Sequence, residues 1–314
     1  MKILFIILFP AILFLSSCGP TSDYREMHRG MDESDEIRFF ADPLVFYDSA
    51  ASMPRLDLSL DIPVSGISFR KNYENNTYFS KINISVNIKN SKGEVVLSKS
   101  YEEKSLYSYE EIKSKAKESR FYIYSYFLSP DNYKLELELK DDYIGNYTKK
   151  SFTINVPDFS VNEISVSDLM LLSKIELNAD GTREITPLIN NNIFGINELY
   201  VFFEIYNNSL RVAAKDYSLK LMSDEGELIK ESSFHYELLQ GKNQKFESVL
   251  TGKVIMKHLE KEPDQDMSMP GPLKKYSFKL ELSDVESGKI IARKKLQFYP
   301  IRLMPGTMNR PPQR

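Results

Sequence analysis

Long stretches of this sequence alternate apolar and polar residues with a period of two. The alternation runs through Leu56–Ile62, Ile82–Ile88 and Leu135–Leu139. Because successive side chains of a β-strand point to opposite faces, the pattern places one face of each strand in a core and the other in water. A chain dominated by it is expected to fold into antiparallel sheets, each with one buried face.

The chain carries this pattern twice. Sliding the sequence along itself superposes Leu56–Ile62 on Leu199–Ile205 and Leu135–Pro157 on Phe278–Pro300. In between, a slightly shorter offset superposes Val86–Val96 on Leu219–Ile229. Self-similarity of this kind indicates an internal repeat.

Each repeat is expected to contain two hairpins that turn at glycine, the residue that most easily adopts the positive φ of tight turns. The turns fall at Gly93 and Gly145 in the first repeat and at Gly226 and Gly288 in the second. About seven short strands in roughly 100 residues are typical of an immunoglobulin-like sandwich. We therefore predict an all-β protein with two tandem immunoglobulin-like antiparallel β-sandwiches and one short decorating helix.

The helix is predicted from a capping box formed by Ser108 and Glu111, and it should run to about Ser119. Residues Val166–Ile175 are a second candidate helix.

The predicted organisation is a signal peptide at 1–17, a tether at 18–53, a first sandwich at 54–157, an interdomain segment at 158–197, a second sandwich at 198–300 and a flexible tail at 301–314. Aromatic residues in the later part of the tether are expected to dock on the first sandwich.

The N-terminus has the pattern of a bacterial lipoprotein signal. Lys2 precedes an apolar run that ends at Leu15, and the run is too short to span a membrane as a helix. The sequence Leu15, Ser16, Ser17, Cys18 matches a lipobox. In a lipobox the chain is cleaved before the cysteine, and acyl chains such as palmitate are attached to that cysteine. Cys18 is the single cysteine of the chain, so no internal disulfide competes for it. An ordinary signal peptide followed by a chance cysteine is the alternative.

Several classes of function are disfavoured by composition. A net charge of −3 disfavours a nucleic-acid-binding protein, which usually has clustered basic residues. The three histidines are scattered, and no nucleophile, metal-ligand or phosphate-loop motif is present, so neither an enzyme nor a bound metal or cofactor is expected. Residues Asn178–Glu184 have the oxygen ligands of a crude calcium loop, but an Asn-Asp-Gly turn explains them better.

Two predicted strands, residues 121–128 and 199–206, are apolar on both faces, and each has several aromatic side chains on one of these faces. Such a face must be covered by something. The favoured cover is the neighbouring sandwich, the tether or the interdomain segment. The alternative is a groove that binds a glycan, a peptide or an envelope protein. The aromatic residues of this candidate binding face are Tyr122, Tyr124, Tyr126, Tyr200, Phe202 and Tyr206.

Several short motifs resemble the N-terminal part of GWxTD-domain lipoproteins of Bacteroidetes-type bacteria over about residues 40–300. They are Arg55–Asp57, Ser91–Gly93, Val156–Ser160, Ser167–Leu169 and Leu199–Asn207. The chain has no tryptophan and therefore lacks the Gly-Trp-x-Thr-Asp region that names the family. The resemblance implies the sandwich part alone and no established activity.

The leading hypothesis is a non-enzymatic envelope lipoprotein that acts as a scaffold or partner-binding module, with a membrane and an unidentified envelope protein as its partners. The alternatives are a glycan- or peptide-binding module that uses the tyrosine faces and, third, an unrecognised hydrolase. Gly19 follows the cysteine in place of the aspartate that retains lipoproteins in the inner membrane. The expected location is the outer membrane, facing the periplasm.

Overall fold

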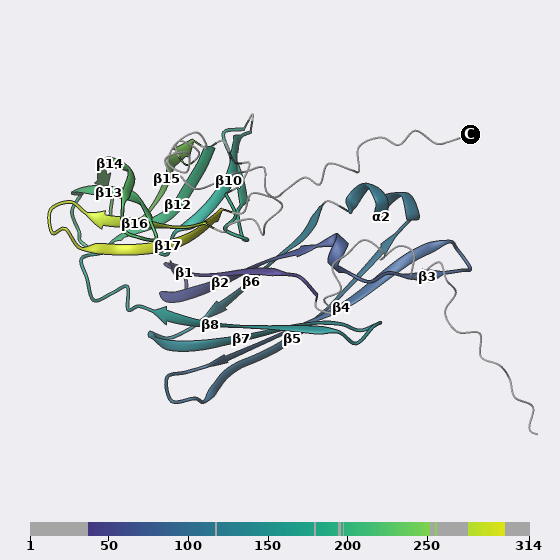
Figure 1. Cartoon of the computed structure of the whole chain (residues 1–314). Coiled ribbons are helices and arrows are strands. Elements are labelled where there is room, and N and C mark those ends of the chain that lie inside the picture. Colours follow the sequence, from purple (N-terminus) through teal and green to yellow (C-terminus); the bar gives the residue numbers. More distant parts are fainter. Residues whose placement is uncertain are drawn as a thin grey trace, which may run out of the picture. The chain divides into compact units, whose positions relative to one another are not determined.

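The computed structural model describes residues 37–116, 118–178, 180–193, 196, 198–251, 255 and 276–298. The predicted signal peptide, the lipobox with Cys18, the first part of the tether and the tail lie outside these ranges. The described residues form antiparallel sheets together with the short helix α2 (Tyr109–Lys115), as Figure 1 shows. The predicted all-β sandwich fold is therefore confirmed.

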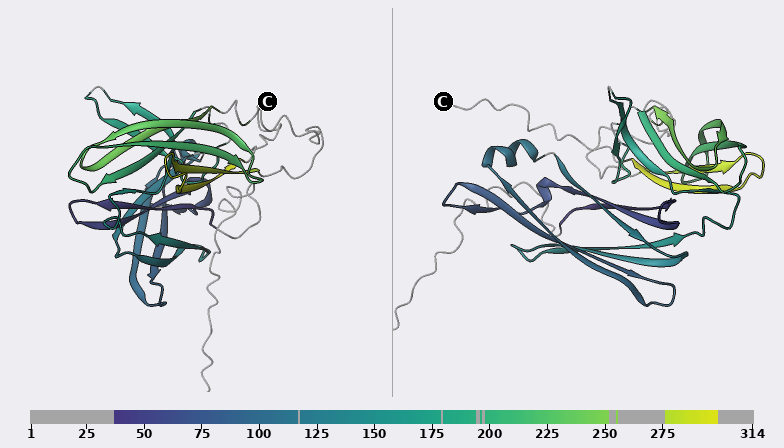
Figure 2. Two further views of the ribbon diagram at one scale, coloured as in Figure 1. Left: turned by 90° about the vertical axis from the view of Figure 1, so that its left-hand side faces the viewer. Right: turned by 180° about the vertical axis from the view of Figure 1, so that it is seen from behind.

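The first sandwich consists of two facing sheets (Figures 1 and 2). One sheet has the order β1-β2-β6. The other has the order β3-β4-β7-β8, with β5 paired to β4, and the short 3-10 helix η1 (Val64–Gly66) follows β2. The strands are β1 (Phe40–Asp48), β2 (Met53–Pro63), β3 (Arg70–Asn72), β4 (Thr77–Lys89), β5 (Val95–Tyr107), β6 (Ser119–Phe127), β7 (Asp131–Asp141) and β8 (Tyr147–Val156).

The second sandwich repeats this arrangement. One sheet has the order β11-β10-β12-β15, with β9 also paired to β12, and the other has the order β14-β13-β16-β17. The strands are β9 (Ile164–Val166), β10 (Met170–Leu177), β11 (Arg183–Pro187), β12 (Glu198–Asn207), β13 (Ala213–Ser223), β14 (Leu228–Leu238), β15 (Gly241–Thr251), β16 (Tyr276–Asp284) and β17 (Ile290–Phe298).

The main strand pairings of the two sandwiches correspond, whereas the short strands β3, β9 and β11 have no counterpart in the other repeat. The ladder β1-β2-β6 matches β10-β12-β15, and the ladder β5-β4-β7-β8 matches β14-β13-β16-β17. This is the strand order of an immunoglobulin-like Greek key. Tyr133, at the start of β7, donates a hydrogen bond from its hydroxyl to the carbonyl of Ser129 at 2.8 Å, which is the tyrosine corner of such folds. Tyr276 begins the corresponding strand β16.

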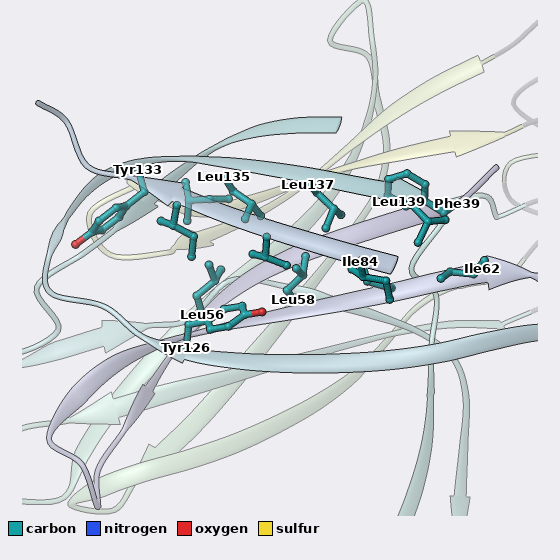
Figure 3. Packing of buried hydrophobic residues seen from close by; sticks show 14 of the residues in the cluster. Phe39, Leu56, Leu58, Ile62, Ile84, Tyr126, Tyr133, Leu135, Leu137 and Leu139 are labelled. Carbon is teal, nitrogen blue, oxygen red and sulfur yellow. The ribbon is translucent and has the colours of Figure 1, made fainter. Parts of the chain in front are cut away.

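The core of the first sandwich lies between its two sheets (Figure 3). Leu56 and Leu58 of β2 face Leu135 and Leu137 of β7, and all four side chains are buried. Fully burying a leucine side chain contributes about 1.5–3 kcal/mol, so these layers supply much of the stability of the sandwich. A separate cluster of the same kind fills the second sandwich.

The predicted turns and the first predicted helix are present. Gly93, Gly145, Gly226 and Gly288 have φ of 82°, 76°, 90° and 66°, which a residue with a Cβ rarely adopts. Ser108 caps α2, with Glu111 completing the capping box. The helix ends earlier than expected, at Lys115. None of the described helices is long and apolar enough to cross a membrane.

Two segments differ from the prediction. The tether was placed at 18–53, but Phe40–Asp48 form strand β1, whose partly apolar sequence pairs along its whole length with β2. Residues 158–197 were placed between the domains, but they contribute β9, β10 and β11 to the second sandwich. The second predicted helix, Val166–Ile175, is wrong because its apolar residues complete the sheet around β12.

Candidate functional site

The three tyrosines predicted as a binding face of β6 point into the first sandwich. Tyr126 is buried beside Leu56 (Figure 3), and its hydroxyl lies 3.1 Å from that of Tyr101. The ring of Tyr124 stacks on Tyr101 with centroids 4.0 Å apart. Tyr122 lies parallel to Tyr124 at 6.4 Å. This face is therefore covered by the second sheet of the same sandwich, through β5, rather than by another domain.

Packing also sets the protonation of these tyrosines. Burial raises the pKa of Tyr124, and the nearby Glu103 carboxylate raises it further. The Tyr124 hydroxyl donates a hydrogen bond to Glu103 at 3.2 Å. Burial likewise raises the pKa of Tyr126. Both phenols therefore stay neutral near pH 7.

The opposite face of β6 is apolar and exposed to solvent. Phe121, Ile123 and Phe127 have 56%, 62% and 49% of their surface exposed. They alternate along the strand with the inward tyrosines, and Ser125 lies between them. Apolar residues grouped on one exposed strand differ from scattered surface ones, because such a patch often marks an interaction site.

Strand β6 is also the edge of its sheet. It pairs with β2 over Ser119–Phe127 without any register shift, and no described strand pairs with its other side. Its one charged residue, Arg120, turns inward, where it donates a hydrogen bond to Ser80 at 2.9 Å and lies 5.3 Å from the ring centre of Tyr107. We call the outward side chains Phe121, Ile123 and Phe127, together with this unpaired edge, the β6 surface.

Most edge strands carry charges that discourage pairing with another chain. Every other described edge strand longer than three residues has at least two charged residues. They are β1 (Asp42, Asp48), β5 (Lys99, Glu102, Glu103, Lys104), β8 (Lys149, Lys150), β11 (Arg183, Glu184), β14 (Lys230, Glu231, Glu237), β15 (Lys242, Lys245, Glu247) and β17 (Arg293, Lys294, Lys295). Strand β6 differs from all of them.

The second predicted aromatic face, on β12, contacts the first sandwich. Phe202 is buried, and its ring centroid lies 6.1 Å from that of Phe46 on β1. Leu44 of β1 and Leu172 of β10 complete the same apolar cluster. Tyr200 lies at the margin of this cluster and is partly buried. We call these contacts the junction of the two sandwiches.

Tyr206 links the sandwiches by hydrogen bonds as well as by packing. Its hydroxyl accepts the backbone N–H of Tyr47 at 2.8 Å and donates to the buried Glu204 carboxylate at 2.5 Å. Its ring lies edge-on to Tyr47 and Phe159. Burial raises the pKa of Tyr206 and so keeps it neutral. Neither predicted aromatic face is therefore an open platform for a ligand.

Charged groups complete the junction. Lys294 of β17 forms an ion pair with Asp42 of β1. Asp168 accepts the backbone N–H of Val45 at 2.8 Å, and its own N–H donates to the Val45 carbonyl at 3.1 Å. A cleft of about 1170 Å³ lies beside these contacts, lined by parts of β1, β8, β9 and β17. Its walls carry both lysine and aspartate side chains, and this mixed lining indicates no single class of ligand.

The described residues of the weaker sequence candidate at Asn178–Glu184 lie in the turn between β10 and β11 and at the start of β11. The Asp180 carboxylate accepts hydrogen bonds from the backbone and hydroxyl of Thr182, and Gly181 has a φ of 83°. Among the described residues, no group of three or more His, Cys, Asp and Glu side chains could hold a metal ion.

The sequence predicted a candidate binding face on the tyrosine side of β6, which the structure turns into the sandwich. The odd-numbered positions Phe121, Ile123 and Phe127 are as apolar as the even-numbered tyrosines. A strand that is apolar on both faces signals a second contact surface. Which face is covered depends on the partner sheet, and the sequence of the strand alone does not show this.

No family model matches this sequence, and neither does any curated protein. A search of solved structures returns weak similarities. Red sea bream transglutaminase has a TM-score of 0.25 and 8% identity, with 88% of this chain and 33% of that one covered. A putative beta-galactosidase from Bacteroides fragilis has a TM-score of 0.24 and 11% identity, with 77% of this chain and 32% of that one covered. Ruminococcus gnavus beta-glucuronidase has a TM-score of 0.21 and 9% identity, with 80% of this chain and 36% of that one covered. This chain thus spans about a third of the length of each.

Proposed function

We propose that this chain is an envelope lipoprotein, anchored in the outer membrane by lipid on Cys18 and facing the periplasm. It acts as a non-enzymatic scaffold that binds a protein partner through the β6 surface. The lipobox at Leu15–Cys18 supports the anchor. The observation that carries the binding function is an edge strand with an exposed apolar face and no outward charge, in a chain whose other described long edge strands are charged.

The chemistry of such an edge favours strand addition. The outward N–H and C=O groups of β6 can pair with an extended segment, and each backbone hydrogen bond contributes about 1 kcal/mol net. Phe121, Ile123 and Phe127 would pack against alternate side chains of that segment. Backbone pairing supplies affinity, and the aromatic and branched side chains supply selectivity.

The second sandwich uses the corresponding face of its edge strand β15 in a side-chain contact. Ile123 pairs with Ser59 of β2, and the corresponding pair in the repeat is Phe246 with Phe202. Phe246 packs 4.8 Å from Phe202, centroid to centroid, in the apolar cluster of the junction. The position of Ile123 is thus part of a protein contact in the second repeat and exposed in the first.

The glycan-binding alternative has less support. It needs aromatic faces that a sugar can reach, whereas Tyr126, Phe202 and Tyr206 are buried. The exposed residues of β6 lack the polar tips with which tyrosine or tryptophan orients a sugar.

A photo-crosslinking amino acid placed at Phe121 tests the proposal in intact cells. The matched control is Tyr147, an aromatic residue on the edge strand β8 that is also 56% exposed. We expect a discrete protein adduct from position 121, its loss in the variant I123K, and no such adduct from position 147. Absence of an adduct at 121, or equal adducts at both positions, would overturn the proposed use of β6.

A further inference from the structure

We infer that the partner bound by the β6 surface is a second copy of this chain, joined by antiparallel pairing of β6 with β6. The inference rests on the proposed function, because it identifies the occupant of the surface already described. It would join the two copies of the β1-β2-β6 sheet into one continuous sheet.

The sequence of β6 is complementary to itself in one register. With a two-fold axis beside Tyr124, Phe121 of each copy lies opposite Phe127 of the other on the exposed face. Ile123 then lies opposite Ser125, so a large side chain meets a small one. Residues directly opposite in an antiparallel pair have Cβ atoms about 4.5–5.5 Å apart, which allows both aromatic pairs to form.

Charge favours β6 over the basic edge strands β17 and β8 for this contact. Two copies that met through β17, with the two-fold axis beside Lys294, would bring the exposed Arg293 of each copy against the exposed Lys295 of the other. Two copies that met through β8, with the axis beside Lys149, would place the two Lys149 side chains opposite each other. At β6 the one charge, Arg120, is directed to Ser80 inside the sandwich, so identical copies meet without repulsion on the exposed face.

A shared membrane would favour the same contact. If lipid on Cys18 anchors every copy, all copies lie in one plane, which raises their effective concentration relative to free solution. A surface of moderate affinity then suffices to hold two copies together.

The first test is the oligomeric state of the full-length lipoprotein in detergent, measured by light scattering coupled to size-exclusion chromatography. The wild type should be a dimer and I123K a monomer with an unchanged circular-dichroism spectrum and melting temperature. The control L228K places the same charge on an exposed leucine of another edge strand, β14, and should stay dimeric. A monomeric wild type, or a dimer that survives I123K, would overturn the inference.

The second test reads the register in membranes of intact cells. The double variant I123C/S125C should form a disulfide-linked dimer on mild oxidation, because these positions face each other across the two-fold axis. The pair Y147C/K149C on β8 should not crosslink. If the chain is monomeric but position 121 still yields an adduct with another protein, the proposed function stands and the second copy does not. If position 121 yields no adduct, both proposals fail.

Discussion

The ammonium of Lys294 lies 2.5 Å from the carboxylate of Asp42, although the two residues belong to different sandwiches. Each side chain is only 10% exposed. Burial raises the pKa of Asp42, and the neighbouring Lys294 opposes that rise. The junction therefore depends on a charge pair that is shielded from water, in addition to the apolar contacts of Phe46 and Phe202.

The variant K294M should destabilise the protein, because it leaves the Asp42 carboxylate buried without its counter-charge. Removing one partner of a buried pair costs about 3–5 kcal/mol. The loss should appear as a lower urea midpoint, followed by circular dichroism. Lys149, which pairs with Glu138 at the surface, provides the control K149M, which should leave the urea midpoint nearly unchanged because water screens an exposed ion pair.

The loss of stability in K294M should also depend on pH. A neutral aspartic acid tolerates burial better than a carboxylate, so the cost of K294M should shrink as the pH falls towards about 4. The double variant D42N/K294M should be more stable than K294M at pH 7. Equal stability of these two variants at that pH would contradict the account of the pair.

Removing the Tyr206 hydroxyl should weaken the junction without opening a large cavity. In Y206F the backbone N–H of Tyr47 loses its acceptor, and Glu204 loses one of its donors. A buried polar group left without a partner costs about 1–3 kcal/mol. The free energy of unfolding should fall by this amount. Y200F, on the more exposed part of the same face, should change it much less.

The variant D168N should stabilise the protein at neutral pH. The protein around Asp168 in the cleft raises its pKa by excluding water from the carboxylate, and the nearby Asp42 charge raises it further. Well below the ordinary pKa of 3.8, the group is protonated in both the folded and unfolded states. As the pH rises from there through the raised pKa, ionising the buried carboxyl costs the folded wild type stability, whereas the asparagine of D168N has no proton to lose.

The advantage of D168N should therefore be present at pH 7 and vanish below about pH 4. An asparagine can still accept the Val45 N–H, so that hydrogen bond is kept. Urea midpoints of both proteins across this pH range measure the effect. A constant difference between them would show that ionisation of Asp168 is not its cause.

The variant C18A should abolish incorporation of an alkyne-labelled fatty acid into the chain and release it from the membrane fraction. Two or three acyl chains hold a protein stably on a bilayer, and without them no strong anchor remains at this position. The variant S125A, which leaves the lipobox and Cys18 unchanged, should be labelled and fractionate as the wild type does. Continued labelling of C18A would exclude Cys18 as the lipid attachment site.

Much of the fold could be predicted because its signals are local. Alternation of apolar residues located β2, β4 and β7, and glycines located the hairpins at residues 93, 145, 226 and 288. The Ser108–Glu111 capping box located α2. Each of these depends on residues close together in the chain, so sequence spacing is enough to find it.

The errors arose where local pattern and tertiary contact disagree. Phe40–Asp48 contain Asp42 and Pro43, which favour an irregular segment, yet pairing with β2 makes them a strand. Met170–Leu177 have apolar spacing compatible with a helix, but their first residues pair with the edge of β12 and so form a strand. In both cases hydrogen bonds to a neighbouring strand of the sheet outweigh local preference.

The candidate site divides in the same way. That β6 is apolar on both faces and has one charge can be read from its nine consecutive residues. The same nine residues do not show that the tyrosines face inward, that Phe121, Ile123 and Phe127 stay exposed, or that β6 is an edge. The reason is that burial and edge position are set by strands far away in the chain, and long-range packing of whole sheets fixes which strands become neighbours.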